Sequence, residues 1–271
     1  MTTSEIARIA ETIEIRMNEA FWAALPPGLE QKRKMQLHCV GGALVSVTPK
    51  STSLQRNRVL GLGVREQASE EMVDQTLDLY RAARVTRFSF HVSPGPQSDE
   101  MTEWITRRGF RLHHRYAKLL RDTSPPEAIK TRLVVKRITR SDARTYARIL
   151  GEVFAGPEDG ESWLAAAVGR PGFSHYLALD GERSVAAAMV YVEGESAWMG
   201  PAATLTAYRR RGAHNALIAA RLRRAAEQGA KWASCATLEP IPRRPAGSYR
   251  NLLKQGFKLH YLRPIWAWER P

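Results

Sequence analysis

Hydrophobic positions recur along the chain at two spacings, one typical of helices and one of strands. Residues 4–24 place Ile6, Ile13 and Met17 at helical spacing, and the Leu-Pro-Pro-Gly run at 25–28 ends that helix. Short runs rich in β-branched and aromatic residues predict strands. We therefore expect helices at 4–24, 69–84, 98–108, 140–154, 161–168, 213–228 and 248–255, and strands at 35–40, 42–48, 58–64, 87–92, 111–120, 133–138, 174–179, 184–192, 196–203, 231–238 and 258–268.

The order of these elements repeats, and so do some of the letters. The segment TRRGFRLHHRYAKLLR at 106–121 matches LKQGFKLHYLRPIWAW at 253–268, with a Gly-Phe pair at the same place in each. Prolines and small polar residues at 122–126 have the composition of a linker. We predict a duplicated α+β fold, with mixed, mostly antiparallel sheets flanked by helices. Its domains are expected at 1–125 and 126–271.

Composition and charge narrow the function classes. Of the 271 residues, 44% are hydrophobic and 25% are charged, enough for a core in each half. The formal charge is +14, with 18 basic and 14 acidic residues up to Pro125 and 23 and 13 after it. The basic second half favours an anionic ligand, which could be a phosphorylated cofactor, an acidic acceptor or nucleic acid.

Several classes of protein are disfavoured. No apolar run approaches the roughly 18 residues that a membrane span needs, and the polar, acidic start is not a secretory signal. We expect a cytoplasmic protein with no membrane partner. Cys39 and Cys235 lie far apart, as reduced thiols would, and no carboxylate or cysteine completes a metal set with His113, His114 and His260. We predict no metal.

The stretch at 198–217 is the most informative for chemistry. A strand runs into a short loop, and three arginines and a glycine then open a helix. The first amide groups of a helix have no internal partners, and the helix dipole adds about half a positive charge there. Gly212 has no side chain, so a phosphate can approach the backbone closely. The pattern predicts a seat for a pyrophosphate; a solvated basic turn is the alternative.

Here the chain resembles the GCN5-related N-acetyltransferase (GNAT) family. The family signature Arg/Gln-x-x-Gly-x-Gly/Ala is similar to residues 209–214, with His214 in place of the last small residue. Residues 248–257 resemble the family's closing helix and Gly-Phe turn. The likeness covers about 131–269, with a weaker echo over 1–121. The chain thus looks like a tandem member, and the resemblance implies a three-layer acyl-CoA N-acyltransferase fold in each half.

The resemblance also implies site residues and a co-substrate, acetyl-CoA. The backbone of Ala202 and Thr204 would hold the pantetheine arm as an added strand would, and Asn251 would lie near that arm. The sheet would splay between 196–203 and 231–238, with the thioester in the gap. The implied pyrophosphate site comprises Arg209, Arg210, Arg211, Gly212, Ala213, His214 and Asn215, with the amide groups of residues 211–215 as donors.

The implied chemistry is direct attack of an amine on the thioester, with a base that deprotonates the amine and an acid that protonates the thiolate. The family's usual acid is a tyrosine four residues before the Gly-Phe glycine, and Leu252 stands there. Tyr249 is the nearest substitute. Glu239, at the end of a strand, is a candidate base. A solvated surface role is the alternative for each.

The first half lacks the signature. Its equivalent loop, 62–71, has one arginine and no glycine at the helix start, and Glu70, Glu71 and Asp74 crowd the first turn. Carboxylates suit the helix dipole but repel phosphate. We therefore predict that this half binds no cofactor and serves as a packing partner, a wall of the acceptor cleft or a surface for a homodimer.

These observations predict an acetyl-CoA-dependent N-acyltransferase with a small-molecule, protein or peptide amine as acceptor. Two alternatives stay open. One is a catalytically silent protein that binds acyl-CoA as a sensor or scaffold, which the missing tyrosine favours. The other is an acyltransferase directed to RNA or aminoacyl-RNA, which the basic second half favours, although no known nucleic-acid module is visible.

Overall fold

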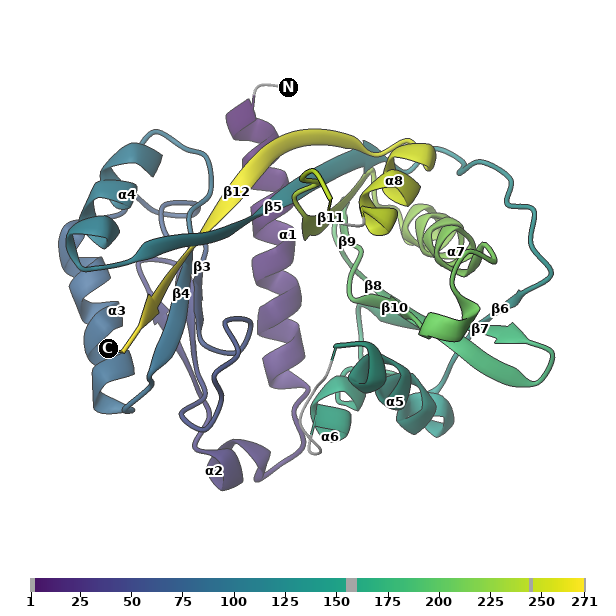
Figure 1. The fold of residues 1–271 in the computed structure, drawn as a ribbon, viewed down its shortest axis with the longest axis horizontal. Helices are drawn as coiled ribbons and strands as arrows, with labels where there is room; N and C mark the ends of the chain where they lie inside the picture. The colour runs from purple at the N-terminus through teal and green to yellow at the C-terminus, as the bar shows by residue number, and fades with distance from the viewer. Residues whose placement is uncertain (1–2, 155–159, 244–245, 271) are drawn as a thin grey trace. The chain divides into compact units, whose positions relative to one another are not determined.

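The computed structural model describes residues 3–154, 160–243 and 246–270. The chain forms two compact units, and neither is one continuous segment (Figure 1). Unit 1 consists of Met1–Trp22, Pro27–Lys118 and His260–Pro271, and unit 2 of Ala23–Pro26 and Leu119–Leu259. Most of the last strand of the chain therefore belongs to unit 1, while the end of the strand before the linker belongs to unit 2.

Unit 1 is a sheet between two layers of helices. Its strands follow the order β1-β2-β3-β4-β12-β5, in which β3 and β4 are parallel and the pairs β1–β2, β2–β3 and β4–β12 are antiparallel. The elements are α1 (Thr3–Ala23), α2 (Leu29–Arg33), β1 (Gln36–Val40), β2 (Ala43–Val47), β3 (Arg58–Leu60), α3 (Glu70–Ala82), β4 (Arg87–His91), α4 (Ser98–Arg107), β5 (Arg111–Asp122) and β12 (Lys258–Glu269).

Apolar side chains on both faces of the unit 1 strands form the interfaces between the sheet and its two helix layers. Val45 and Val59 contribute to a buried cluster shared with α3 and α4, while the adjacent Leu44 and Leu60 pack with Ile15 of α1. Successive side chains of a strand point to opposite faces, so one short apolar run serves both layers.

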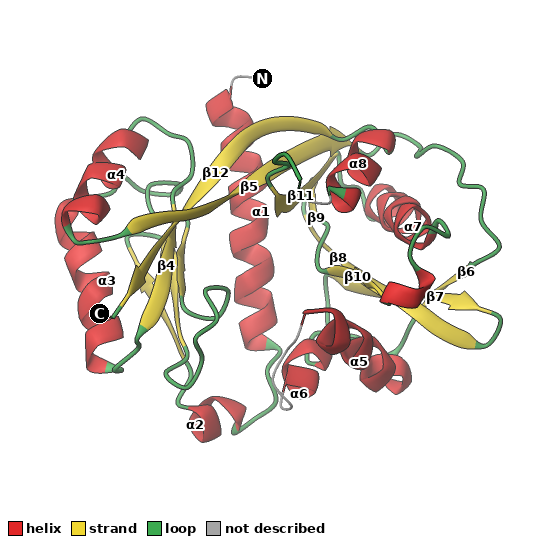
Figure 2. Cartoon of the chain, viewed as in Figure 1, coloured by secondary structure: helices red, strands yellow, loops and turns green. Residues whose placement is uncertain are grey.

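Unit 2 has the same three layers. Its strands follow the order β5-β11-β9-β8-β7-β6, with β10 paired to β8. Helices α5 and α7 both contact β8 and lie on opposite faces of the sheet (Figure 2). The remaining elements are β6 (Val134–Arg137), a 3-10 turn (Arg140–Asp142), α5 (Ala143–Phe154), α6 (Gly160–Ala165), β7 (Phe173–Asp180), β8 (Arg183–Glu193), β9 (Ser196–Trp198), β10 (Ala202–Thr204), a 3-10 turn (Thr206–Tyr208), α7 (Ala213–Glu227), β11 (Trp232–Leu238) and α8 (Gly247–Lys254).

The duplication seen in the letters is also present in the backbone. Gly109 follows α4 with φ 85°, and Gly256 follows α8 with φ 79°. In both places the next residue, Phe110 or Phe257, is buried, and its amide donates to a carbonyl five residues earlier. Glycine favours this left-handed conformation, which ends a helix and turns the chain into the next strand.

A group of ionised side chains lies inside unit 1. Glu11 and Glu14 of α1 are 0% and 4% exposed. Lys118 Nζ of β5 lies 3.2 Å from Glu11 Oε1 and 2.7 Å from Glu14 Oε2. Arg263 Nη1 of β12 lies 2.5 Å from Glu11 Oε2 and 2.7 Å from Glu14 Oε2. The Tyr261 hydroxyl also donates to Glu11. Two carboxylates thus face two cations, which offsets much of the cost of burying them.

The cations control the charge state of these carboxyls. Burial alone would raise the pKa of each, but Arg263 and then Lys118 outweigh it and hold both values below the usual range, that of Glu14 well below. The two glutamates therefore stay ionised, and the cluster joins α1 to β5 and β12.

Removing one charge should leave its partners buried without compensation. We expect Glu14→Gln to destabilise the protein by about 3–5 kcal/mol at neutral pH, measured by denaturant unfolding. The carboxyl's lowered pKa contributes stability above its unfolded value of 4.5, and this contribution is lost as pH falls below that value. The variant should therefore lose less stability than wild type between about pH 5 and pH 3. Asp78→Asn, which breaks an exposed pair with Arg81, is the control and should change little. A Glu14→Gln protein as stable as wild type would contradict this account.

Candidate functional site

The expected strand at 196–203 is interrupted, and the interruption opens the sheet. Trp198 of β9 pairs with Tyr191 of β8, while Ala202 of β10 pairs with Ala188. Three residues on one strand, Met199 to Pro201, therefore lie opposite two on the other, which is a β-bulge. β9 is parallel to β11 as far as Trp198 and Ser234, and the Met199 amide donates to the Ser234 carbonyl. Beyond that point β10 pairs only with β8, so it separates from β11.

The bulge leaves one edge of β10 without a strand partner. The carbonyl of Pro201 accepts from Met189 of β8, and the amide of Leu205 donates to Val185. Because hydrogen-bonding direction alternates along a strand, the amide and carbonyl of Ala202 and Thr204 point away from β8. In agreement, Thr204 O accepts from Arg209 Nε at 3.4 Å on that side. This edge can pair with an extended ligand, as the resemblance implied.

Helix α7 begins beside this edge. Its N-cap is Gly212, which has φ 86° and no side chain to cap the first turn. The first helical hydrogen bond runs from the Ala216 amide to the Gly212 carbonyl. The amides of the residues between them therefore have no acceptor inside the helix. Together with the helix dipole they form a site suited to an anion.

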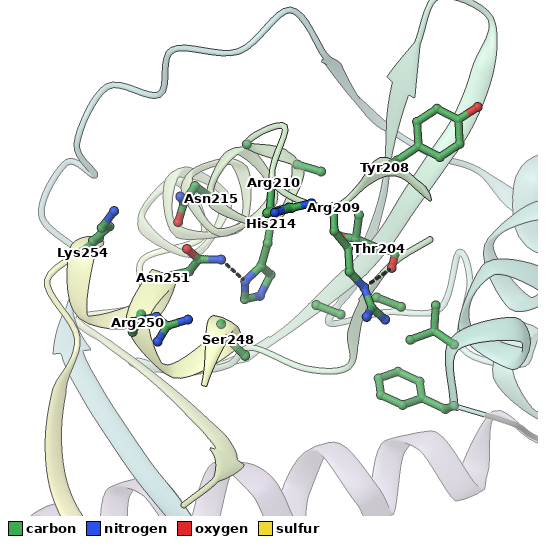
Figure 3. A pocket seen from close by; sticks show the side chains of 17 residues that line it. Thr204, Tyr208, Arg209, Arg210, His214, Asn215, Ser248, Arg250, Asn251 and Lys254 are labelled. Carbon is green, nitrogen blue, oxygen red and sulfur yellow. Dashed lines mark hydrogen bonds between the residues drawn. The ribbon is translucent and has the colours of Figure 1, made fainter. Parts of the chain in front are cut away.

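A cavity of about 660 Å³ joins the open strand edge to the start of α7 (Figure 3). The lining residues that the structure describes all belong to unit 2. They are Val153, Phe154, Ala202, Ala203, Thr204, Tyr208, Arg209, Arg210, Gly212, Ala213, His214, Asn215, Gly247, Ser248, Arg250, Asn251 and Lys254. None of these residues carries a carboxylate. The cavity thus brings together all the predicted cofactor residues except Arg211.

The Arg211 side chain has a different environment. Its Nη1 lies 2.9 Å from Asp180 Oδ2, and its guanidinium lies over the Tyr208 ring, 5.1 Å from the ring centroid. The carboxylate and the ring hold this cation, so the three arginines of the motif are not equivalent. Arg209 and Arg210 line the cavity, whereas the side chain of Arg211 does not.

Gly212 has a role in packing that the sequence did not reveal. A Cβ placed there would lie 3.1 Å from Thr131 Cβ, closer than ordinary contact, and the positive φ already disfavours side chains. Thr131 Oγ1 also donates to the Arg211 carbonyl at 2.8 Å. The glycine is therefore required by the protein's own backbone and packing, in addition to any approach of a ligand.

His214 is held by a neighbouring helix. Its Nδ1 lies 3.1 Å from Asn251 Nδ2 of α8, and Figure 3 shows the two side chains pointing toward each other. Burial, aided by Arg221, lowers the pKa of His214 to about 3. The imidazole is therefore neutral near pH 7 and adds hydrogen-bonding capacity but no charge to the cavity.

The two catalytic candidates do not line this cavity. Tyr249 is half-buried in the first turn of α8, and Glu239 immediately follows β11. Sequence reasoning also passed over Arg250 and Lys254, which lie one turn apart on α8 and do line the cavity. The sequence did contain a signal for these two residues. They are four positions apart on a predicted helix and flank Asn251, and residues four apart share a helix face.

The corresponding helix end in unit 1 is capped by the protein itself. Ser69 is the N-cap of α3, and its side chain accepts from the Met72 amide. Glu70 and Asp74 bind Arg108, which directly follows α4, at 2.8 and 2.7 Å. The strands do not separate here, since β3 and β4 remain paired as far as Leu60 and His91. The start of α3 is therefore unsuited to an anion, because its N-cap is already occupied by Ser69 and carboxylates lie nearby.

Two further expectations concern metals and membranes. Within residues 3–154, 160–243 and 246–270, no group of three or more His, Cys, Asp or Glu side chains is placed to hold a metal ion. None of the helices in those same ranges combines the length and apolar character that a membrane span requires.

Comparison with known proteins places this geometry in a fold family. A GNAT protein from Sphaerobacter thermophilus shares 13% identity at a TM-score of 0.63, over 99% of this chain and 94% of that chain. A GNAT protein from Kribbella flavida shares 13% at 0.61, over 92% and 95%. A tandem GNAT protein from the clavulanic acid biosynthesis pathway shares 15% at 0.64, over 98% and 94%. No protein family and no curated protein matches the sequence. The likenesses show a GNAT fold and confirm the predicted α+β class.

The packing role of Gly212 can be separated from its backbone conformation. Gly229 has nearly the same φ, 84°, but nothing lies within 4 Å of a Cβ placed there. Gly229→Ala should therefore cost only the conformational penalty, about 1 kcal/mol of unfolding free energy. Gly212→Ala should cost about 1–3 kcal/mol more, because its methyl group meets Thr131. Denaturant unfolding of both variants measures the difference, and equal losses would show that Thr131 imposes no constraint.

Proposed function

We propose that this protein is an acyl-CoA-dependent N-acyltransferase, with acetyl-CoA as co-substrate and its site in the second half, 126–271. One observation carries the proposal: a single cavity joins the uncapped start of α7 to the unpaired edge of β10. Coenzyme A has a diphosphate that suits the first feature and an amide-containing pantetheine arm that suits the second. The GNAT fold of the chain supports the same assignment.

The proposed ligand contacts follow from these two features. The amides of residues 211–215 donate to the diphosphate, and Arg209 and Arg210 neutralise its charge. The backbone of Ala202 and Thr204 pairs with the pantetheine arm. Asn251, positioned by His214, contacts the arm from α8. The thioester then lies where β10 leaves β11.

The reaction is a direct transfer to a primary amine. A base removes a proton from the acceptor ammonium, and the amine nitrogen attacks the thioester carbon, which gives a tetrahedral oxyanion. The oxyanion collapses to an amide and releases the thiolate of coenzyme A, which takes up a proton from an acid. Backbone amides at the strand edge can stabilise the oxyanion. The acceptor is a small-molecule or protein amine in the cytoplasm.

The first half, 1–125, is proposed to be a GNAT-like domain without a cofactor. The filled N-cap of α3 and the ion pairs of Glu70 and Asp74 support this view. Such a half can contribute packing, part of the acceptor-binding surface or a contact for a homodimer.

An acyl-CoA sensor is the second candidate. Leu252, in place of the usual tyrosine, is buried at 4% exposure, and His214, which lines the cavity, has its pKa lowered to about 3. Binding and turnover separate the candidates. Acetyl-CoA at a hundredfold excess over its dissociation constant should stabilise the protein by about 2.7 kcal/mol in a thermal-shift experiment. Thiol release with a panel of amines then supports the enzyme, and stabilisation without turnover supports the sensor. No stabilisation, with salt-sensitive RNA binding, would favour the nucleic-acid alternative.

The two environments of the motif's arginines give a matched test of cofactor binding. Arg210→Ala removes a cation that lines the cavity, while Arg211→Ala removes one that already binds Asp180. We expect the first to weaken coenzyme A binding about tenfold and the second much less, by isothermal titration calorimetry. Glu70→Ala, in the first half, should have no effect. Equal losses in the two arginine variants would contradict the proposed location of the diphosphate.

The proposed acid and base can be tested separately from binding. Tyr249→Phe and Glu239→Gln should each lower kcat by about 10²–10⁴-fold if the side chain transfers a proton in the reaction. Neither residue lines the cavity, so the dissociation constant of coenzyme A should stay within a factor of two or so of wild type. Turnover close to wild type in either variant would remove that residue from the mechanism.

A further inference from the structure

The cavity contains more positive charge than a diphosphate requires. Arg209 and Arg210 lie at the α7 side, together with the free amides of the first helical turn. Arg250 and Lys254 line the cavity from α8, and none of the lining residues that the structure describes has a carboxylate. Several cations in one concave site make the local electrostatic potential positive and repel one another. This favours a ligand whose negative charge offsets theirs.

The cations of α8 form a pair distinct from those of α7. Arg250 and Lys254 are four residues apart and so share a helix face. Asn251 lies on the same helix, and its hydrogen bond to His214 connects α8 to the first turn of α7 (Figure 3). The α8 pair is thereby kept beside the diphosphate seat but on a separate element.

Among the side chains that the structure describes, in residues 4–154, 163–243 and 246–270, no carboxylate lies within ion-pair distance of Arg250 or Lys254. In the same unit, Arg211 binds Asp180 and Arg224 binds Glu227. Both side chains are exposed to solvent. They are therefore available to an anionic group of a ligand.

We propose that Arg250 and Lys254 form a second phosphate subsite, which binds the 3′-phosphate of the coenzyme A ribose. This inference rests on the proposed function. Coenzyme A carries one phosphate monoester besides its diphosphate, and a monoester adds about 1.5–2 negative charges near pH 7. The four cations of the cavity then match the charge of the whole ligand. The subsite makes the protein selective for coenzyme A over 3′-dephospho-coenzyme A.

The test is a comparison of two ligands on three proteins by isothermal titration calorimetry. The proteins are wild type, Arg250→Ala/Lys254→Ala, and the control Arg148→Ala/Arg223→Ala. The control loses the same charge from exposed helix positions that do not line the cavity. The ligands are coenzyme A and 3′-dephospho-coenzyme A. Circular dichroism of each variant checks that it is folded.

We expect wild type and the control to bind coenzyme A at least tenfold more tightly than the dephospho form. The Arg250→Ala/Lys254→Ala variant should bind both ligands equally, with the affinity of wild type for the dephospho form. The preference should also shrink between 50 and 200 mM salt, roughly as expected for an exposed charge contact.

Other outcomes overturn the subsite and identify what fails. Equal binding of the two ligands by wild type overturns the subsite and leaves the proposed function intact. Equal weakening of both ligands in the variant would assign the α8 cations to the diphosphate. Unchanged coenzyme A binding in the variant, with a raised KM for an acidic amine, would assign them to the acceptor. If wild type binds neither ligand, the proposed function fails as well.

Discussion

The amides in the first turn of α7 are the constraint from which the rest of the site follows. A helix start must find acceptors for these groups, and Gly212, at the N-cap, has no side chain to supply one. Other residues are disfavoured at this position, because φ is positive and a Cβ there would lie 3.1 Å from Thr131 Cβ. The bulge at 199–201 turns β10 away from β11 next to this helix end. Donors for an anion and an unpaired strand edge therefore lie in one cavity.

The two units differ in how the first turn of the corresponding helix, α3 or α7, is capped. In unit 1 the corresponding helix end is capped by Ser69, its acidic residues bind Arg108, and β3 and β4 stay paired. Unit 1 also has ionised side chains in its interior, where Glu11 and Glu14 bind cations from two strands. One duplicated fold thus provides a unit with buried, compensated charges and a unit with a cavity whose described lining residues include no carboxylate.

Local patterns in the sequence predicted most of the fold. Helical spacing and β-branched runs located nearly all the elements, because these signals depend on neighbours only a few residues away. The strand expected at 196–203 was wrong as a single strand, since the bulge depends on pairing with β8. The burial of Glu11 was not foreseen either, because its partner Arg263 lies 252 residues along the chain. The short helix α2 at 29–33 was also missed.

The motif at 209–215 located the residues that line the cavity at the start of α7, with the exception of Arg211, but it could not predict side-chain direction. Whether Arg211 points into the cavity depends on Asp180 in another strand, which the motif does not contain. The central claim is that coenzyme A occupies this cavity, and a crystal structure of the protein with coenzyme A tests it most directly. The account predicts diphosphate density at the amides of residues 211–215 and pantetheine density along β10. An empty cavity, or coenzyme A bound elsewhere, would contradict it.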